Sequence, residues 1–280
     1  MNKNNTLPCV LTIAGSDSGA GAGIQADLKA MAAQGTYGVT VVTAVTAQNT
    51  LGVDQFTIME PQLVEAQLDA VLRDFPVAAV KTGMLGNALI VEVVAAKLKE
   101  YGLRRIIVDP VMVAKSGDSL LTKDTQSAIR EKLLPLSLVI TPNIPEAEVL
   151  CDRKINDIKG MKEAAQILHA RGSDYVLLKG GHLQGGDVLT DVLFDGKMFY
   201  YYRAKRINTQ NTHGTGCTYG SAIAAFLALG YPVPQAVMRA RCYLQAILPW
   251  DPALGNGHGP MDHFAVWRNL AQLSKRGRRG

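Results

Sequence analysis

Short apolar runs alternate with helix-spaced segments along this 280-residue chain. The apolar runs have strand length, are rich in β-branched residues and cover 9–14, 37–47, 77–81, 105–108, 138–140 and 175–178. The segments with apolar residues at helical spacing are 24–31, 61–72, 89–98 and 161–170. Strands that are apolar throughout and joined by helices predict a three-layer α/β fold, with a mostly parallel central sheet and helices on both faces.

Two short strand-like segments late in the chain predict a different connection. Residues 188–194 and 198–202 flank Asp195-Gly196, a pair typical of a tight turn, so we expect a β-hairpin there. A polar loop is expected at 48–52.

The pattern shows no internal repeat and no interdomain linker. We therefore expect a single α/β domain over residues 9–268, which is a common size for one large α/β domain. It would be preceded by a disordered N-terminus, residues 1–8, and followed by a basic C-terminal tail, residues 269–280.

Composition narrows the class of protein. The chain is 48% hydrophobic and 19% charged, which excludes a disordered protein. Its net charge is +5, but four positive charges are Lys275, Arg276, Arg278 and Arg279, and without them the body carries only +1. No basic face is implied, so we do not expect a nucleic-acid partner.

The cysteines and the lengths of the apolar runs indicate the cellular compartment of the protein. The four cysteines show no CxxC pair and no metal-ligand spacing, which is typical of reduced thiols in a cytosolic protein. No apolar run approaches the length that spans a bilayer, and the N-terminus lacks a signal-peptide core. We expect a cytoplasmic protein without a membrane partner.

Small and polar residues cluster where the predicted strands end. The clusters read GSDSG, AQNT, KTGMLG, DPVM, TPN and KGGH. In open α/β sheets, ligands bind outside the carboxyl ends of the strands. Six such clusters predict a catalytic crevice along that edge of the sheet.

Residues 211–225, NTHGTGCTYGSAIAA, predict an anion site at the edge of this crevice. Gly214 and Gly216 form a turn before a small-residue helix that we expect to begin at about Cys217. Free backbone N–H groups and the helix dipole attract anions there. A cysteine in the first helical turn could be a base or a nucleophile, since its thiolate would be stabilised. The alternative is an ordinary glycine turn with a buried structural cysteine.

Six motifs in order resemble one family. They read AGSDSGAGAGIQADLK (14–29), KTGML (81–85), VDPVMVAKSGDSLL (108–121), ITPNIPEAEVL (140–150), LLKGGHL (177–183) and NTHGTGCT (211–218). From about residue 11 to 267 the chain resembles the hydroxymethylpyrimidine kinase/phosphomethylpyrimidine kinase family of thiamine biosynthesis, within the ribokinase-like fold. One departure is Ala20, which stands within a glycine-rich element and should matter little if its φ is negative.

The resemblance implies phosphoryl transfer from ATP to the hydroxymethyl group of 4-amino-5-hydroxymethyl-2-methylpyrimidine, and then to the resulting monophosphate. It implies that Asp109 and Glu146 hold hydrated Mg²⁺, with Asn143 in the Mg–phosphate shell. An alternative for Glu146 is that it caps the helix after Pro145.

The resemblance also assigns the phosphate contacts. Gly214, Thr215, Gly216 and Cys217 would offer backbone donors to the phosphates. Lys179 and Lys115 are the two lysines assigned to the ATP phosphates. The alternative for Lys179 is that it ends its strand and reaches into solvent. Lys115 lies with Ser116 and Gly117 in a segment that could fold over the phosphates.

On the acceptor side, the resemblance places the pyrimidine against five residues. These are Gly15, Asp27, Gln48, Met84 and Val111. Gln48 carries both a donor and an acceptor, which suits an aminopyrimidine edge. Met84 would otherwise be a core residue, and Asp27 could instead pair with the N-terminal turn of its own helix.

Cys217 stands where many ribokinase-like enzymes have an aspartate that takes the proton of the acceptor hydroxyl. The helix N-terminus is expected to shift this thiol toward thiolate. We expect the base to matter for the first phosphorylation more than for the second, because the monophosphate is already ionised near pH 7. For His213, three roles stay open: a phosphate contact, orientation of the turn, or a structural role.

Two other functions stay open at this point. A pyridoxal kinase of the same fold would act on another flat heteroaromatic with a hydroxymethyl group. A non-catalytic ligand-binding module is the alternative of a different class, although it would need neither a metal pair nor a base. The resemblance also implies a homodimer.

Overall fold

The computed structural model describes residues 6–112, 122–182 and 186–269. These residues form a nine-stranded sheet in the order β3-β2-β1-β4-β5-β6-β7-β8-β9. The strands are β1 (Cys9–Asp17), β2 (Tyr37–Gln48), β3 (Val53–Ile58), β4 (Val77–Thr82), β5 (Ile106–Val108), β6 (Val139–Ile140), β7 (Tyr175–Leu178), β8 (Val188–Phe194) and β9 (Phe199–Lys205).

The middle of the sheet is parallel and its two edges are antiparallel. Strands β2, β1, β4, β5, β6 and β7 pair in parallel. Strand β3 pairs antiparallel with β2, and β8 and β9 extend the other edge as an antiparallel hairpin. The predicted mostly parallel sheet and the predicted hairpin are both confirmed.

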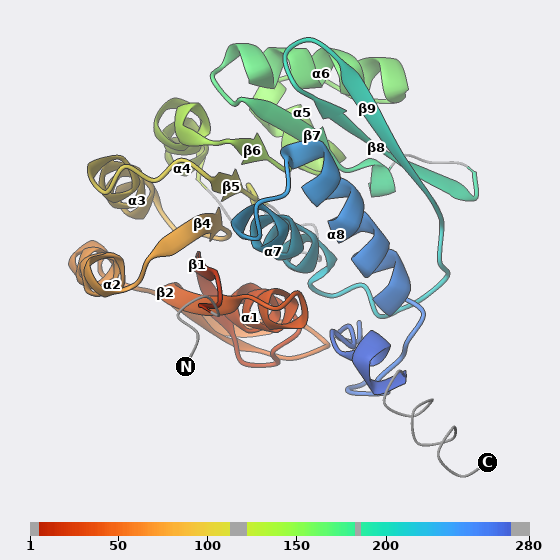
Figure 1. Ribbon diagram of the computed structural model, residues 1–280, viewed down its shortest axis with the longest axis horizontal. Coiled ribbons are helices and arrows are strands. Elements are labelled where there is room, and N and C mark those ends of the chain that lie inside the picture. Colours follow the sequence, from red (N-terminus) through yellow and green to blue (C-terminus); the bar gives the residue numbers. More distant parts are fainter. Residues whose placement is uncertain (1–5, 113–121, 183–185, 270–280) are drawn as a thin grey trace.

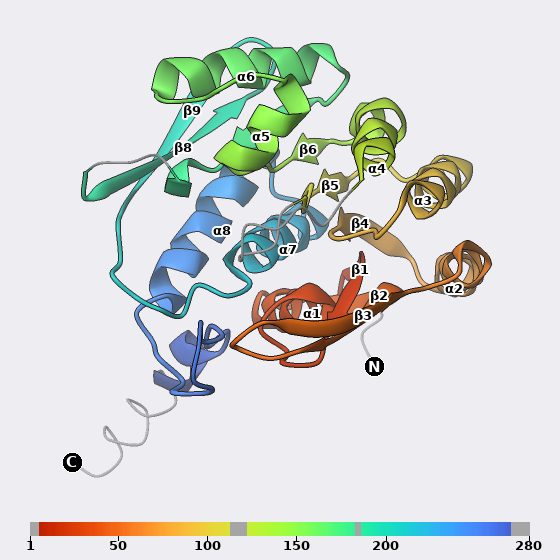
Figure 2. The same cartoon turned by 180° about the vertical axis from the view of Figure 1, so that it is seen from behind.

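Helices cover both faces of the sheet (Figures 1 and 2). The helices are α1 (Gly23–Ala33), α2 (Pro61–Asp74), α3 (Ala88–Glu100), α4 (Lys123–Ala128), α5 (Ile144–Cys151), α6 (Ile158–Ala170), α7 (Thr215–Ala228) and α8 (Val233–Ile247). A π-helical turn, Ile129–Leu133, and 3₁₀ turns at Leu134–Leu136 and Gly180–His182 complete the described elements.

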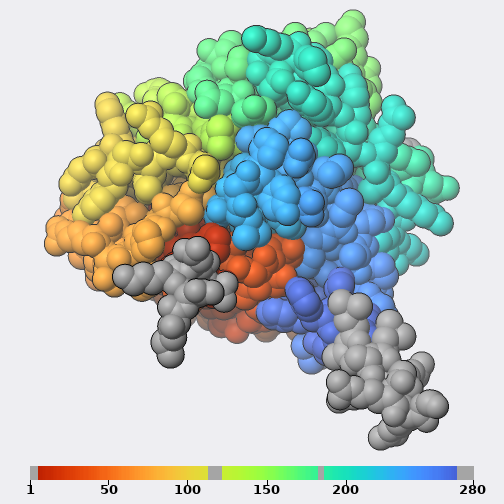
Figure 3. All heavy atoms as spheres, in the orientation of Figure 1, coloured from red at the N-terminus to blue at the C-terminus, as the bar shows by residue number. Residues whose placement is uncertain are grey.

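Two hydrophobic cores lie on opposite faces of the sheet. Because side chains alternate along a strand, Leu11 and Ile13 join the core under α2 to α6, whereas Val10 joins the core under α1, α7 and α8. Figure 3 shows α7 and α8 in blue at the centre of the second face, between the red-orange N-terminal part and the green-to-teal residues that follow α5. Helix α7 is buried over most of its length, which fixes its N-terminus relative to the strand ends.

Three elements fall outside the predicted pattern. Strand β3 was not predicted because its residues, VDQFTI, are mostly exposed and carry no core periodicity. Helix α8 buries Arg241 among its apolar positions, which interrupts the apolar stripe. Helix α4 is only six residues long.

In the part of the chain that the structure describes, no helix combines the length and apolarity needed to cross a membrane.

Candidate functional site

Contacts at three glycines show that the strand-end loops come together beside the N-terminus of α7. A Cβ on Gly23 would lie 2.4 Å from the carbonyl oxygen of Gly15, and a Cβ on Gly214 would lie 1.8 Å from that of Gly21. A Cβ on Gly216 would lie 3.6 Å from both Asp109 Oδ2 and Lys179 Nζ. The loop after β1, the ends of β5 and β7, and the start of α7 therefore meet in one place, and the crevice predicted there stays a prediction.

An ion pair lies under the first turn of α7. Lys179 Nζ is 2.8 Å from Asp109 Oδ1, and Thr141 donates to the same oxygen at 3.1 Å. Burial tends to raise the pKa of Asp109, but the charges of Lys179 and Lys81 and these hydrogen bonds outweigh it and hold the pKa below its usual range. The charge of Asp109 likewise overcomes desolvation and raises the pKa of Lys179, so both groups are ionised. The exposed fraction of the Lys179 side chain is only 15%, so it is not a strand-end lysine in open solvent.

Glu146 caps the helix that the TPNIPE motif begins. Its carboxylate accepts the backbone N–H of Asn143 at 2.8 Å, while the Asn143 side chain accepts the backbone N–H of Glu146 at 2.9 Å, which is a complete capping box. The capping alternative is thus confirmed, and a metal role for Glu146 stays a prediction. Burial raises the pKa of Glu146 to about 7, and the negative charge of Asp109 contributes, although Lys179 opposes it.

The two carboxylates fit a hydrated divalent cation. They repel each other strongly enough to affect the pKa of Glu146, and a cation held through water would relieve that repulsion. Among the residues that the structure describes, no group of three or more His, Cys, Asp or Glu side chains is placed to bind a metal. The donor set therefore suits Mg²⁺, which keeps several waters, better than an all-protein cage.

The electrostatic surroundings of Cys217 differ from the prediction. Helix α7 begins at Thr215, so the thiol lies in the first turn as expected. Burial nevertheless raises the pKa of Cys217 to about 11, with Asp27 and Asp109 adding to the effect and Lys81 opposing it. The pKa of the thiol is therefore shifted against the predicted thiolate, because desolvation and two nearby carboxylates outweigh the charge of Lys81 and the backbone N–H of Gly23.

Asp27 is enclosed by protein partners. It has no exposed surface, and its oxygens accept hydrogen bonds from Thr12 at 2.6 Å, Ser221 at 2.7 Å and Lys81 at 3.0 Å. These partners replace the alternative pairing with its own helix turn, and Asp27 is a buried partner of Lys81. A contact between Asp27 and the pyrimidine stays a prediction. The sequence did carry a signal for that lysine, since a charge inside the apolar run VAAVK requires a buried counter-charge.

Three of the other predicted acceptor residues, Gly15, Met84 and Gln48, lie near the end of β1. A Cβ on Gly15 would lie 2.8 Å from Met84 Cε, so these two residues are in contact. Met84 and Gln48 are half-buried rather than core residues, and Val111 is half-buried in the loop after β5. These placements are compatible with the predicted roles, which stay predictions. Lys115, like Ser116 and Gly117, lies outside the described residues.

The loop after β1 is organised by Asp17, a residue that was not among the predicted site residues. Its carboxylate accepts the backbone N–H groups of Gly19, Gly21 and Ala22 at 2.8 to 3.1 Å, and it lies 2.9 Å from His213 Nε2. Burial opposes ionisation, but these hydrogen bonds hold the pKa of Asp17 below its usual value.

Ala20 in the same loop has φ of 57°, so the condition of negative φ is not met and the substitution for glycine carries backbone strain.

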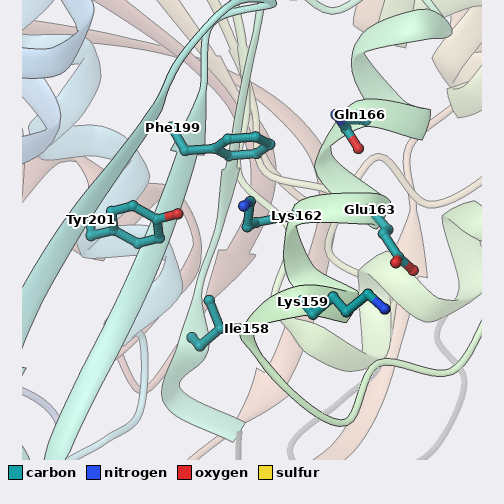
Figure 4. A pocket seen from close by; sticks show the side chains of 7 residues that line it. All are labelled: Ile158, Lys159, Lys162, Glu163, Gln166, Phe199 and Tyr201. Atoms are coloured by element: carbon teal, nitrogen blue, oxygen red, sulfur yellow. The ribbon is translucent and has the colours of Figure 1, made fainter.

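A separate surface hollow of about 490 Å³ lies between α6 and β9 (Figure 4). Its lining residues are Ile158, Lys159, Lys162, Glu163, Gln166, Phe199 and Tyr201. The Lys162 ammonium lies 4.8 Å from the centre of the Phe199 ring, a cation–π contact. None of the residues predicted for the reaction lines this hollow, so we assign it no part in the chemistry.

Known proteins are similar to this chain in sequence and in fold. A family model described as phosphomethylpyrimidine kinase matches residues 17–262. The hydroxymethylpyrimidine/phosphomethylpyrimidine kinase of Bacillus subtilis is 46% identical, over 95% of this chain and 98% of that protein. A thiamine biosynthesis bifunctional protein of Geobacter sulfurreducens is 53% identical over 91% of this chain, which spans about half of that protein, 52%.

A solved structure is similarly close. The ADP complex of Bacillus subtilis pyridoxal kinase superposes with a TM-score of 0.86 at 36% identity, over 93% of this chain and 99% of that one. This likeness confirms the ribokinase-like fold class predicted from the sequence.

Proposed function

The chain belongs to the phosphomethylpyrimidine kinase family, and from that membership we propose that it transfers phosphoryl groups from ATP to an aminopyrimidine in thiamine biosynthesis. The first acceptor is the hydroxymethyl group of 4-amino-5-hydroxymethyl-2-methylpyrimidine, and the second is its monophosphate. The observation that carries the proposal is the N-terminal turn of α7 over the buried Asp109–Lys179 pair, because it joins backbone donors and a fixed ammonium in one place.

Phosphoryl transfer depends on positioning and on compensation of negative charge. In the proposed arrangement, the backbone N–H groups of Gly216 and Cys217 donate to phosphate oxygens, and Gly214 permits the turn that aims them. The N–H of Thr215 already donates to the carbonyl oxygen of Thr212 at 3.4 Å, so it contributes only if that bond is exchanged for one to phosphate. The Lys179 ammonium, already held by Asp109, faces the same phosphates. On the family resemblance, Lys115 adds a further positive charge.

We assign hydrated Mg²⁺ to Asp109 and Glu146. When bound, the cation supplies positive charge against the phosphate oxygens. Asn143 uses its side-chain oxygen to cap α5, so its NH₂ group is the part available to phosphate.

Cys217 is proposed as the base for the first phosphorylation. Its thiol is protonated near pH 7, because its pKa is raised to about 11. Only the small fraction of molecules that carries the thiolate can therefore accept the proton of the acceptor hydroxyl. The monophosphate has no such proton to lose. Replacing Cys217→Ser should therefore slow the first phosphorylation at least tenfold more than the second, and an equal loss on both acceptors would remove the assignment.

The function is tested by incubating the purified chain with ATP, Mg²⁺ and the aminopyrimidine alcohol. Chromatography of the products should show the monophosphate first and the diphosphate later, with one ADP formed per phosphate added. Absence of ATP consumption with any acceptor would instead support the non-catalytic module.

A pyridoxal kinase activity is the second candidate. It is favoured by the similarity to the pyridoxal kinase structure, which extends over nearly the whole chain. Gln48 favours the aminopyrimidine, since a carboxamide can both donate and accept. Parallel turnover with each acceptor at equal concentration decides between the two: a higher kcat/KM for pyridoxal would overturn the main assignment.

The family resemblance also leads us to propose a homodimer of single-domain subunits, which light scattering at micromolar concentration would measure. The cysteines at 9, 151, 217 and 242 are free thiols. Free thiols suit a reducing compartment, so we propose a cytoplasmic location.

A further inference from the structure

Gln48, the residue proposed to recognise the aminopyrimidine edge, lies against His213. Its side-chain nitrogen is 3.2 Å from His213 Nε2, and that ring nitrogen is also 2.9 Å from Asp17 Oδ2. A ring nitrogen offers either one N–H or one lone pair. It cannot donate to Asp17 and also accept from Gln48, so in one of the two contacts the donor and the acceptor must be different from this pairing.

The surroundings of Asp17 decide which one. Besides His213, its carboxylate accepts three backbone N–H groups, and its exposed fraction is 3%. A carboxylate with that set of donors is ionised and can only accept. His213 Nε2 therefore carries a proton and donates it to Asp17.

With that proton in place, the nitrogen of Gln48 would face another donor. A carboxamide keeps its shape when it turns by 180°, which exchanges its nitrogen and its oxygen. The exchanged oxygen of Gln48 then accepts from the same His213 Nε2–H, which is shared between Asp17 Oδ2 at 2.9 Å and Gln48 at 3.2 Å, so that no donor faces another donor.

A second contact supports the same exchange independently. The Gln48 oxygen lies 3.1 Å from Thr46 Oγ1, and Thr46 Oγ1 also lies 3.0 Å from the carbonyl oxygen of Ser16. Thr46 has one hydroxyl hydrogen for these two acceptors. After the exchange, Gln48 donates to Thr46 Oγ1, and the Thr46 hydrogen goes to Ser16.

We propose that the Asp17–His213 pair is a positioning device that fixes the orientation of the Gln48 carboxamide and thereby sets acceptor specificity. Two of the four hydrogen-bonding positions of Gln48 go to His213 and Thr46. One N–H and one oxygen lone pair then remain, which match a heteroaromatic edge with a ring nitrogen beside an exocyclic amino group. This specificity role rests on the function proposed above.

Both partners are held firmly enough for such a role. A Cβ on Gly21 would lie 2.2 Å from His213 Cδ2, so the Cδ2 edge of the ring points at this glycine, and the His213 backbone is bridged to Pro260. The Gln48 backbone is clamped by Ser18, whose hydroxyl accepts its N–H at 2.8 Å and donates to its carbonyl at 2.7 Å. The contact between the two side chains is therefore set by the fold before any ligand binds.

The first test needs no activity. Long-range ¹H–¹⁵N correlation spectra of the ¹⁵N-labelled wild-type chain report the protonation of each ring nitrogen, and His213→Asn identifies the His213 signals among the five histidines. We expect a proton on His213 Nε2 at pH 7.5. A proton on Nδ1 alone would overturn the proposal, whatever the enzyme phosphorylates.

The second test uses His213→Phe, which keeps a flat ring and removes the N–H donor. We expect the KM for the aminopyrimidine to rise at least tenfold, with kcat within threefold and the KM for ATP unchanged, and the preference over pyridoxal to fall. In a Gln48→Leu background, the same change should alter KM less than twofold, because His213 acts through Gln48.

Independent effects of the two substitutions, or an equal rise in the KM for ATP, would contradict the proposal. His258→Phe, at an exposed histidine, is the matched control and should leave all constants unchanged. Thermal unfolding checks that each variant is folded. If His213→Phe does not fold, the wild-type spectra still test whether His213 Nε2 carries the proton. A wild-type chain that ignores the aminopyrimidine would refute the proposed function, while the proton on His213 would still be measured.

Discussion

Ala20 adopts a backbone conformation that suits glycine. Its φ of 57° lies in the left-handed region, where a Cβ costs about 1 kcal/mol or more. The loop enforces it through hydrogen bonds that involve only the Ala20 backbone, from its N–H to Asp17 O and from Lys29 to its carbonyl. We predict that Ala20→Gly raises the free energy of unfolding by about 0.5–1 kcal/mol, measured by urea denaturation.

The matched control for this prediction is Ala22→Gly. Ala22 lies in the same loop with φ of −133°, so glycine relieves no strain and should leave stability unchanged or lower it. A gain of equal size in both variants would show that the loop, rather than the sign of φ at Ala20, limits stability.

Cys217 gives a prediction about pH. A thiol with its pKa raised to about 11 gains its basic form only as the pH rises toward that value. The rate with the alcohol as acceptor should therefore increase between pH 7 and 9, approaching about tenfold per pH unit. The rate with the monophosphate should stay flat, since its second pKa, about 6, is already passed.

Initial rates at saturating ATP measure both profiles in one buffer series. Cys217→Ser should abolish the rise for the alcohol without changing the flat profile for the monophosphate. A plateau for the wild type below pH 8 would mean that Cys217 is not the group that titrates.

Single residues also show where sequence reasoning reached its limit. Asp109 and Lys179 could be expected at the same edge of the sheet, because each follows an apolar strand directly, and they do form an ion pair. The environment of Cys217 could not, because the carboxylates that raise its pKa come from 190 and 108 residues away, at Asp27 and Asp109. The arrangement of charged side chains around a site depends on tertiary contacts, which no local sequence pattern contains.

Elements were predictable wherever they face the core. The strands of the parallel sheet were found because both of their faces are buried, which leaves an apolar run in the sequence. Strand β3 is an exposed antiparallel edge, and α8 buries a charged residue, so neither leaves the usual pattern. The start of α7 was expected near Cys217 and lies at Thr215, because the turn glycine at 214 caps the helix directly.

The start of α7 yields a prediction at the scale of an element. Gly214 has φ of 77°, and a Cβ there would lie 1.8 Å from the carbonyl oxygen of Gly21. Gly214→Ala must displace either the helix start or the loop after β1, so we expect at least about 2 kcal/mol loss of stability. We also expect more than a hundredfold loss of kcat/KM, since the N–H donors would no longer aim at the phosphates.

Gly216→Ala is the contrasting variant. Its Cβ would make ordinary contacts of 3.6 Å with Asp109 and Lys179 and its φ is not positive, so folding should be nearly unaffected. Its methyl group would occupy space beside the phosphates, so the KM for ATP should rise. Equal destabilisation of the two variants, measured by thermal unfolding, would contradict this account of the turn.

For the molecule as a whole, one buried ion pair connects the sheet to the helical layer that carries α7. Lys81 on β4 and Asp27 on α1 are both fully buried, with Lys81 Nζ 3.0 Å from both carboxylate oxygens. Ser221 on α7 and Thr12 on β1 donate to the same carboxylate. Desolvation would lower the pKa of Lys81, but the charge of Asp27 outweighs it and raises that pKa well above its usual value, so the lysine stays protonated near neutral pH.

Breaking this pair should affect the whole structure rather than one loop. We predict that Lys81→Met costs about 3–5 kcal/mol of unfolding free energy, because it leaves the Asp27 charge buried without its partner. Lys81→Met combined with Asp27→Leu should cost less than the sum of the single changes by at least about 2 kcal/mol, since no unpaired charge remains. Lys154→Met, which breaks the exposed pair with Glu148, should change stability by less than about 1 kcal/mol. Urea denaturation of the four variants measures all of these terms, and additive effects of the changes at Lys81 and Asp27 would show that the pair does not join the sheet to the helices of this face.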